Sequence, residues 1–152
     1  LIGNGRQLIE ACHRAAEHQA DLVVTSELAL WGYPPRDLLL RPALRQQQQQ
    51  VLDQLAGDLP PGLALLLGVS EAADDGHLPD LYNSAALVEG GGWRVVARKR
   101  LLPSYDVFDE RRYFRSAEQP CTGWVAPTDA GWQADTVEIA PDPRRNRTHD
   151  AA

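Results

Sequence analysis

The feature of this sequence that most restricts its fold is an apolar run at residues 63–69, Leu-Ala-Leu-Leu-Leu-Gly-Val. A membrane-spanning helix needs about 20 apolar residues, and no run in this chain approaches that length. A short continuous apolar segment bounded by Gly62 and Ser70 is typical of a strand that is buried on both faces. The run therefore predicts a central sheet with helices packed against it.

Periodic segments on either side of this run alternate between helix and strand patterns. Apolar residues recur at helical spacing over 5–19, and a second helix is expected from Pro42 to Gly57, with a polar face formed by the glutamine run 46–50. Strands are expected at 22–26, and at 82–89 and 93–99, the last two joined by a Gly-Gly-Gly turn as a hairpin. The order predicts an α/β layered architecture.

Composition excludes several classes of function. The chain has 152 residues, 43% of them hydrophobic and 24% charged, which is typical of a globular domain. The formal net charge is −6 and the arginines are spread among acids, so we expect no nucleic-acid partner. Because no apolar run is long enough for a membrane helix, we expect no membrane partner either. Two cysteines make no disulfide framework, which favours a cytoplasmic location, and no Cys/His cluster has the spacing of a metal site.

Lys99 is the one lysine in a chain that carries fourteen arginines. A compact ammonium on a flexible stem differs from a planar, forked guanidinium, so a site that needs the former cannot use the latter. Lys99 ends an expected strand, where a lysine can stabilise a developing oxyanion. The alternative is a solvated strand-end cation beside two arginines, retained by chance.

Glu27 ends another expected strand and begins a loop rich in glycine and proline, Glu-Leu-Ala-Leu-Trp-Gly-Tyr-Pro-Pro. A carboxylate at the rim of an apolar strand is a position where a general base can be built. The alternative is that Glu27 caps the strand or pairs with a surface arginine.

Three stretches together resemble one enzyme family. They are the segment 20–39 around Glu27, the segment Leu-Tyr-Asn-Ser-Ala-Ala-Leu at 81–87, and the segment 99–114, which contains Leu-Pro-Ser-Tyr-Asp-Val-Phe-Asp-Glu-Arg-Arg-Tyr-Phe. The chain resembles the carbon–nitrogen hydrolase (nitrilase) superfamily over about residues 4–119. Within it, the last segment is most similar to the glutaminase domains of glutamine-dependent NAD synthetases.

The resemblance implies a nitrilase-like αββα sandwich with a Glu-Lys-Cys triad and glutamine as the substrate. Glu27 would be the general base and Lys99 would stabilise the tetrahedral intermediate. Glu110 matches an auxiliary acid that orients Lys99, and Tyr105 matches a position that contacts glutamine. Tyr33 and Asn83 would be scaffolding near the pocket.

The resemblance stops near residue 119, so we expect a partial glutaminase domain at 1–119 and an unmatched tail at 120–152. Cys121 is not expected to be the nucleophile, because no strand precedes it and no acid follows it. The tail would follow from a frameshift near residue 120 or from a lineage-specific extension. It shows no periodic element and is expected to be disordered. The first strand of the fold and the strands after about residue 119 would be missing, and the homo-oligomer of the family is not expected.

Three functions therefore stand open. The chain is part of a glutamine amidohydrolase that supplies ammonia for amidation of deamido-NAD, a catalytically silent fragment or binding module, or a stand-alone amidase. A Ser-Gly-Gly-x-Asp pyrophosphate loop is absent from the sequence, so ATP and Mg²⁺ are expected only in a synthetase domain outside it, and no cofactor is expected here.

Overall fold

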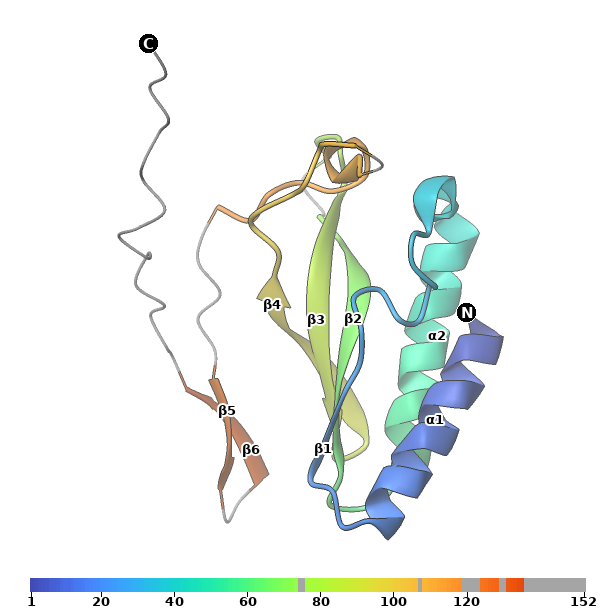
Figure 1. The fold of residues 1–152 in the computed structure, drawn as a ribbon, viewed down its shortest axis with the longest axis vertical. Coiled ribbons are helices and arrows are strands. Elements are labelled where there is room, and N and C mark those ends of the chain that lie inside the picture. Colours follow the sequence, from blue (N-terminus) through green and yellow to red (C-terminus); the bar gives the residue numbers. More distant parts are fainter. Residues whose placement is uncertain (74–75, 107, 119–123, 129–130, 136–152) are drawn as a thin grey trace.

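A computed structural model describes residues 1–73, 76–106, 108–118, 124–128 and 131–135. The chain runs through two helices and a four-stranded sheet, followed by a separate hairpin (Figure 1). The helices are α1 (Ile2–Glu17) and α2 (Pro42–Asp58), with short 3-10 helices η1 (Arg36–Leu40) and η2 (Glu110–Arg112). The strands are β1 (Leu22–Val24), β2 (Ala64–Ala72), β3 (Leu81–Glu89), β4 (Gly92–Arg98), β5 (Trp124–Thr128) and β6 (Gly131–Asp135).

The main sheet has the order β1-β2-β3-β4, in which β1 and β2 are parallel and the other pairs are antiparallel. Both helices lie on one face of this sheet (Figure 1). The parallel pair is joined through α2, as a crossover connection requires, and β3 and β4 form the expected glycine-turn hairpin. The predicted α/β layered fold is confirmed.

The main core lies between the helices and the sheet. It contains Cys12 of α1, four residues of α2 and alternate residues of β2. The apolar run at 63–69 does form a central strand, but the prediction that both faces are buried was wrong. Leu65, Leu67 and Val69 face the helices and are at most 1% exposed, whereas Leu66 and Gly68 on the other face are only partly buried.

The glutamine run of α2 is not wholly a polar surface. Gln48 is 4% exposed, its Oε1 accepts a hydrogen bond from Trp31 Nε1 at 2.6 Å, and its Nε2 donates to the Ser70 carbonyl at 2.7 Å. Ser70 also donates its backbone N–H to Gln48 Oε1 at 3.0 Å. One side chain therefore joins α2, β2 and the loop that follows β1.

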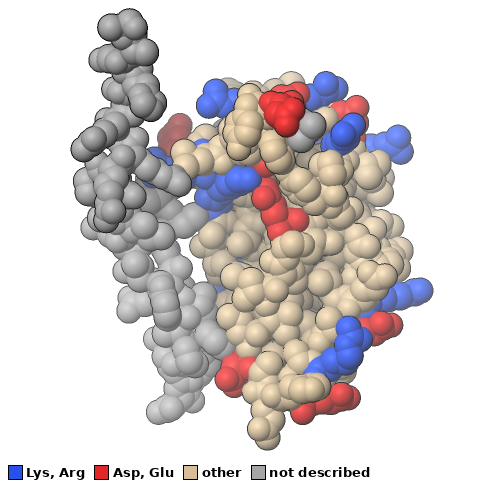
Figure 2. Space-filling model, in the orientation of Figure 1, with Lys and Arg blue, Asp and Glu red and all other residues tan. Residues whose placement is uncertain are grey.

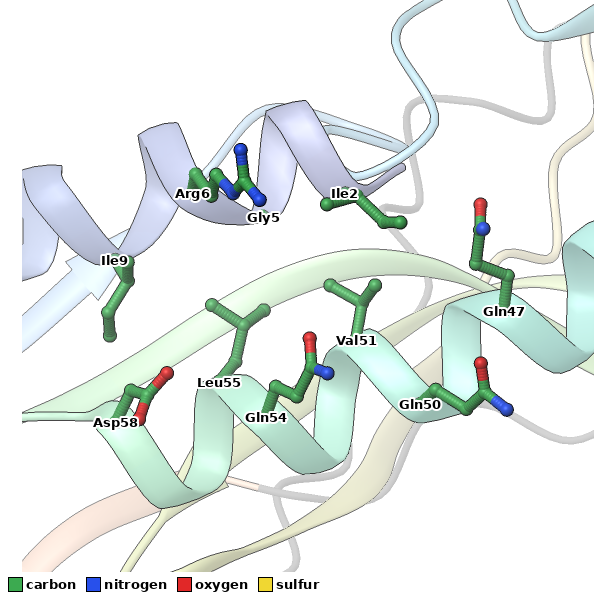
Figure 3. A pocket seen from close by; sticks show the side chains of 10 residues that line it. All are labelled: Ile2, Gly5, Arg6, Ile9, Gln47, Gln50, Val51, Gln54, Leu55 and Asp58. Carbon is green, nitrogen blue, oxygen red and sulfur yellow. The ribbon is translucent and has the colours of Figure 1, made fainter.

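Helices α1 and α2 pack closely because of a glycine. A Cβ at Gly5 would lie 2.6 Å from Val51 Cγ1, closer than non-bonded carbon atoms approach. Beside this contact the two helices border a shallow hollow of about 380 Å³, into which Ile9 and Leu55 point (Figure 3). The hollow lies on the helical side of the molecule, opposite the open face of the sheet.

Strands β5 and β6 pair antiparallel as a short hairpin with Trp124 opposite Asp135. The sequence pattern suggested no periodic element in this region, because five-residue strands are too short to produce a clear alternation. Within the described ranges, no helix is long and apolar enough to cross a membrane.

Candidate functional site

Glu27 lies on a tight turn that begins three residues after β1. The next residue, Leu28, is buried and has φ of +50°, a conformation that costs a residue with a side chain about 1 kcal/mol or more. The carbonyl of Leu28 accepts the N–H groups of Trp31 at 2.9 Å and Gly32 at 3.1 Å, which closes the turn. This turn sets the direction in which the Glu27 side chain leaves the sheet.

Gly68 of β2 lets this turn approach the sheet. A Cβ at Gly68 would lie 2.4 Å from the Leu28 nitrogen and 3.1 Å from the Cα of Glu27. These are backbone atoms, which cannot move aside as the end of a flexible side chain can. Gly68 therefore allows the turn that carries Glu27 to pack against β2. The sequence pattern did not reveal this role.

Lys99 follows the last residue of β4 and remains tied to the sheet through its N–H, which donates to the Asn83 carbonyl at 2.7 Å. Its Nζ donates to Glu27 Oε1 and to Glu110 Oε1, both at 2.9 Å. The Lys99 side chain is 29% exposed. The alternative of a solvated strand-end cation is thus wrong, because two carboxylates hold this ammonium.

Glu110 begins η2 and is 7% exposed. Its backbone N–H donates to the Pro103 carbonyl at 3.2 Å, and its carbonyl accepts the N–H of Phe114 at 2.8 Å. The backbone from which the Glu110 side chain projects is held on both sides as a result. Its Oε2 is buried and has no hydrogen-bond partner within the described ranges, so Lys99 is the group that satisfies this carboxylate.

The three charges influence one another. Burial alone would lower the pKa of Lys99, but the hydrogen bonds and charges of Glu27 and Glu110 outweigh burial and raise it. Burial raises the pKa of Glu110, and the nearby Glu27 charge adds to that effect against the opposing influence of Lys99. Lys99 is therefore held as an ammonium between two acids.

Two further side chains belong to this cluster. Asn83 of β3 is 5% exposed and donates its Nδ2 to Glu27 Oε1 at 2.5 Å. Tyr33 lies close enough that burial first, and then the charges of Glu110 and Glu27, raise the pKa of its hydroxyl. The family resemblance implied only scaffolding roles for both residues, and no local pattern in the segment 81–87 marks Asn83 as a polar contact.

Two surface hollows meet at Lys99. One, of about 320 Å³, is lined by Glu27, Asn83 and Lys99 together with the open face of the sheet. The other, of about 930 Å³, extends from Lys99 along the following loop to Tyr105, which is 69% exposed.

Acidic and basic side chains lie next to one another toward the upper end of the molecule in Figure 2, above a broad uncharged area.

The structure brings Glu27, Lys99 and Glu110 together and places Tyr105 on the rim of the adjoining hollow. The position of Cys121 lies outside the described residues. Cys12, the one cysteine within them, is fully buried in the core under α1 and lines neither hollow. Among the described residues no group of three or more His, Cys, Asp or Glu side chains could hold a metal ion.

Comparison with known proteins places this geometry in a family. Residues 3–139 match the family model described as carbon–nitrogen hydrolase. The glutamine-dependent NAD(+) synthetase of Synechocystis is 44% identical over 120 residues, covering 77% of this chain and 22% of that protein. The enzyme of the same name from Thermotoga maritima is 40% identical over 118 residues, covering 77% of this chain and 20% of that protein. This chain therefore spans about a fifth of the length of these relatives.

Solved structures agree with the sequence matches. A glutamine-dependent NAD+ synthetase from Acinetobacter baumannii superposes with a TM-score of 0.70 at 34% identity, covering 87% of this chain and 24% of that one. An amidase from Nesterenkonia has the same fold, with a TM-score of 0.64 at 21% identity, covering 87% of this chain and 49% of that one. The protein is a member of the carbon–nitrogen hydrolase family.

Proposed function

We propose that this chain carries part of the glutamine amidohydrolase site of a glutamine-dependent NAD synthetase. In this role it helps to release ammonia from glutamine for the amidation of deamido-NAD. The observation that carries the proposal is the cluster in which Lys99 Nζ lies 2.9 Å from both Glu27 and Glu110. The 44% identity to the Synechocystis enzyme supports glutamine as the substrate.

The proposed reaction begins with proton transfer from a cysteine thiol to the Glu27 carboxylate. The thiolate sulfur attacks the amide carbon of glutamine, and the carbonyl π electrons move onto oxygen. When the oxyanion collapses, the C–N bond breaks and Glu27 returns the proton to the leaving ammonia. Glu27 then accepts a proton from water as the water oxygen attacks the glutamyl thioester. When this second tetrahedral intermediate collapses, the C–S bond breaks and Glu27 returns the proton to the sulfur, which releases glutamate and restores the thiol.

Lys99 stabilises the negative charge that develops on the amide oxygen in both steps. Glu110 keeps the ammonium in place and charged, because it supplies a buried carboxylate in addition to the exposed carboxylate of Glu27. Tyr105, at the far end of the larger hollow, contacts the amino-acid part of glutamine. We also propose that the glutaminase-like segment ends near residue 119. The reaction would take place in the cytoplasm.

Two other functions have specific support. The fold shared with an amidase from Nesterenkonia is compatible with an aliphatic amide as the substrate. A catalytically silent fragment or binding module agrees with the burial of Cys12, which leaves no accessible thiol among the described residues. Both alternatives predict different results in one experiment.

The experiment replaces the matched segment of the Synechocystis synthetase with the corresponding residues of this chain; we call the product the chimera. Ammonia release is measured with glutamine, asparagine and a short aliphatic amide. We expect glutamine to be strongly preferred. Comparable turnover of the aliphatic amide would favour the stand-alone amidase.

NAD formation from free ammonia is the control, because it bypasses the amidohydrolase site. A chimera that forms NAD from ammonia but releases none from glutamine would contradict the proposed function and favour a silent segment. A chimera inactive with both donors has not folded, and the matched segment is then exchanged in two halves on either side of residue 60.

A further inference from the structure

Asn83 makes two contacts with the cluster from a position near the start of β3. Its side-chain Nδ2 donates to Glu27 Oε1 at 2.5 Å, and its backbone carbonyl accepts the N–H of Lys99 at 2.7 Å. The residue is 5% exposed, so its amide has lost the hydrogen bonds that water would offer. A buried amide donor that faces a carboxylate forms a strong, charge-assisted hydrogen bond.

Both donors on Glu27 meet at one oxygen. Oε1 accepts from Asn83 Nδ2 and from Lys99 Nζ, whereas Oε2 receives neither of these donors; the third group beside Glu27, the Glu110 carboxyl, is itself an acid. The turn at Leu28 and the close approach of Gly68 fix the backbone from which this side chain leaves. The two oxygens of Glu27 are thus placed in different environments.

This difference has a chemical consequence. An oxygen that already accepts two hydrogen bonds has fewer lone-pair positions left for a third partner than an oxygen that accepts none. Proton transfer also needs the acceptor atom within hydrogen-bond reach of its partner in a fixed direction. A carboxylate that could rotate would present either oxygen and spend much of its time in an unproductive orientation.

We infer that Asn83 is a positioning residue that, together with Lys99, holds Glu27 Oε1 and leaves Oε2 as the oxygen that exchanges protons during glutamine hydrolysis. The inference rests on the proposed function, in which Glu27 is the base. It assigns to Asn83 a role that differs from the oxyanion stabilisation of Lys99. Asn83 itself touches neither substrate nor thiol in this account.

A spectroscopic test uses the complete 152-residue chain. The side-chain amide protons of Asn83 are observed by ¹⁵N-resolved NMR in the unsubstituted chain, in Glu27→Gln and in Glu71→Gln. Glu71→Gln is the matched control, because it neutralises a carboxylate of β2 that pairs with Ser84 and Arg98 instead. We expect one Asn83 amide proton far downfield, moving upfield in Glu27→Gln and unchanged in Glu71→Gln. An Asn83 signal that is the same in all three proteins would overturn the inference.

A kinetic test uses the chimera with Asn83→Ala, Asn83→Asp and Ser84→Ala. Aspartate has the shape of asparagine without the donor, and Ser84→Ala removes a hydrogen bond to a carboxylate outside the cluster. We expect kcat for glutamine hydrolysis to fall about tenfold to a hundredfold in both Asn83 variants, with KM changed less than about threefold. Ser84→Ala should retain the rate of the chimera, and NAD formation from free ammonia should be unchanged throughout.

The outcomes separate the inference from the function on which it rests. Full kcat in Asn83→Ala, with glutamine hydrolysis intact in the chimera, overturns the positioning role alone. A low rate in Asn83→Ala but not in Asn83→Asp also overturns it, because shape rather than the donor would then matter. Loss of glutamine hydrolysis in the unsubstituted chimera contradicts the proposed function, and the NMR comparison still decides whether Asn83 holds Glu27.

Discussion

The position of Lys99 explains why this residue is a lysine and not an arginine. Its Nζ lies between two carboxylate oxygens at equal distances of 2.9 Å, on a side chain that is 29% exposed. A guanidinium presents several N–H groups in a rigid plane and needs more room than one ammonium. The geometry therefore gives a physical reason for a lysine in a chain that otherwise uses arginine.

We predict that Lys99→Arg is nearly as damaging as Lys99→Ala in the chimera. Each should lower the rate of glutamine hydrolysis by roughly a hundred- to a thousandfold, the usual cost of losing one group that stabilises an oxyanion. The measurement is ammonia release, with NAD formation from free ammonia as the control. Near-full activity of Lys99→Arg would mean that any cation suffices at this position.

Gly68 provides a prediction about stability. Gly68→Ala would place a Cβ 2.4 Å from the Leu28 nitrogen, so the turn that carries Glu27 must move away from β2. We expect a loss of about 1–3 kcal/mol in the free energy of unfolding, measured by urea denaturation. Gly57→Ala is the matched control, because no atom lies within 4 Å of its Cβ and alanine favours the helix. Equal effects of the two substitutions would show that the close approach carries no cost.

At the scale of elements, the sequence predicted most of what local periodicity can report. The helix expected from Pro42 and the glycine-turn hairpin are both present, and α1 begins and ends two or three residues earlier than expected. Local periodicity could not predict contacts between residues that lie far apart in the sequence. The burial of Gln48 and of Asn83 depends on partners 17 and 56 residues away, Trp31 and Glu27 respectively, which no local pattern specifies.

Gln48 connects three elements and should be sensitive to substitution. Gln48→Ala would leave the buried indole N–H of Trp31 and two backbone groups of Ser70 without this partner. We expect the free energy of unfolding to fall by about 2 kcal/mol or more, since each unpaired buried polar group costs about 1–3 kcal/mol. The exposed neighbour serves as the control, and Gln49→Ala should change stability by less than about 0.5 kcal/mol. A small effect at Gln48 would imply that water replaces the lost partner.

Strands β2, β3 and β4 are joined on one face by Glu71, which accepts hydrogen bonds from Ser84 at 2.8 Å and from Arg98 at 2.7 Å. Burial alone would raise the pKa of Glu71, but the hydrogen bonds from Arg98 and Ser84 outweigh burial and lower it. A lowered pKa in the folded state means that this interaction stabilises the fold above the unfolded pKa of about 4.3. That stabilisation is lost as the pH falls through the folded-state value.

We therefore predict that Glu71→Gln lowers the free energy of unfolding by about 1–2 kcal/mol at pH 7, and by progressively less below about pH 4. Urea denaturation of both proteins across this pH range gives the difference directly. Glu17→Gln, at the exposed end of α1, is the control for a neutralised glutamate. A difference that stays constant with pH would contradict the linkage.

At the scale of the whole molecule, one sheet collects the candidate site from segments far apart in the chain. Glu27 follows β1, Asn83 lies within β3 and Lys99 follows β4, and each reaches the same end of the sheet. The family resemblance anticipated the grouping of Glu27, Lys99 and Glu110. The arrangement of donors on Glu27 Oε1 could not be anticipated, because it depends on the register that places Ser70 opposite Asn83.

The central claim is that Glu27, held by this cluster, takes part in glutamine hydrolysis. The most direct measurement compares the rate of ammonia release from glutamine in the chimera with the rate in the same chimera carrying Glu27→Gln, which keeps the size of the side chain and removes its basicity. We predict a loss of at least about a hundredfold, with NAD formation from free ammonia unchanged. An equal rate of glutamine hydrolysis in the two proteins would contradict the account.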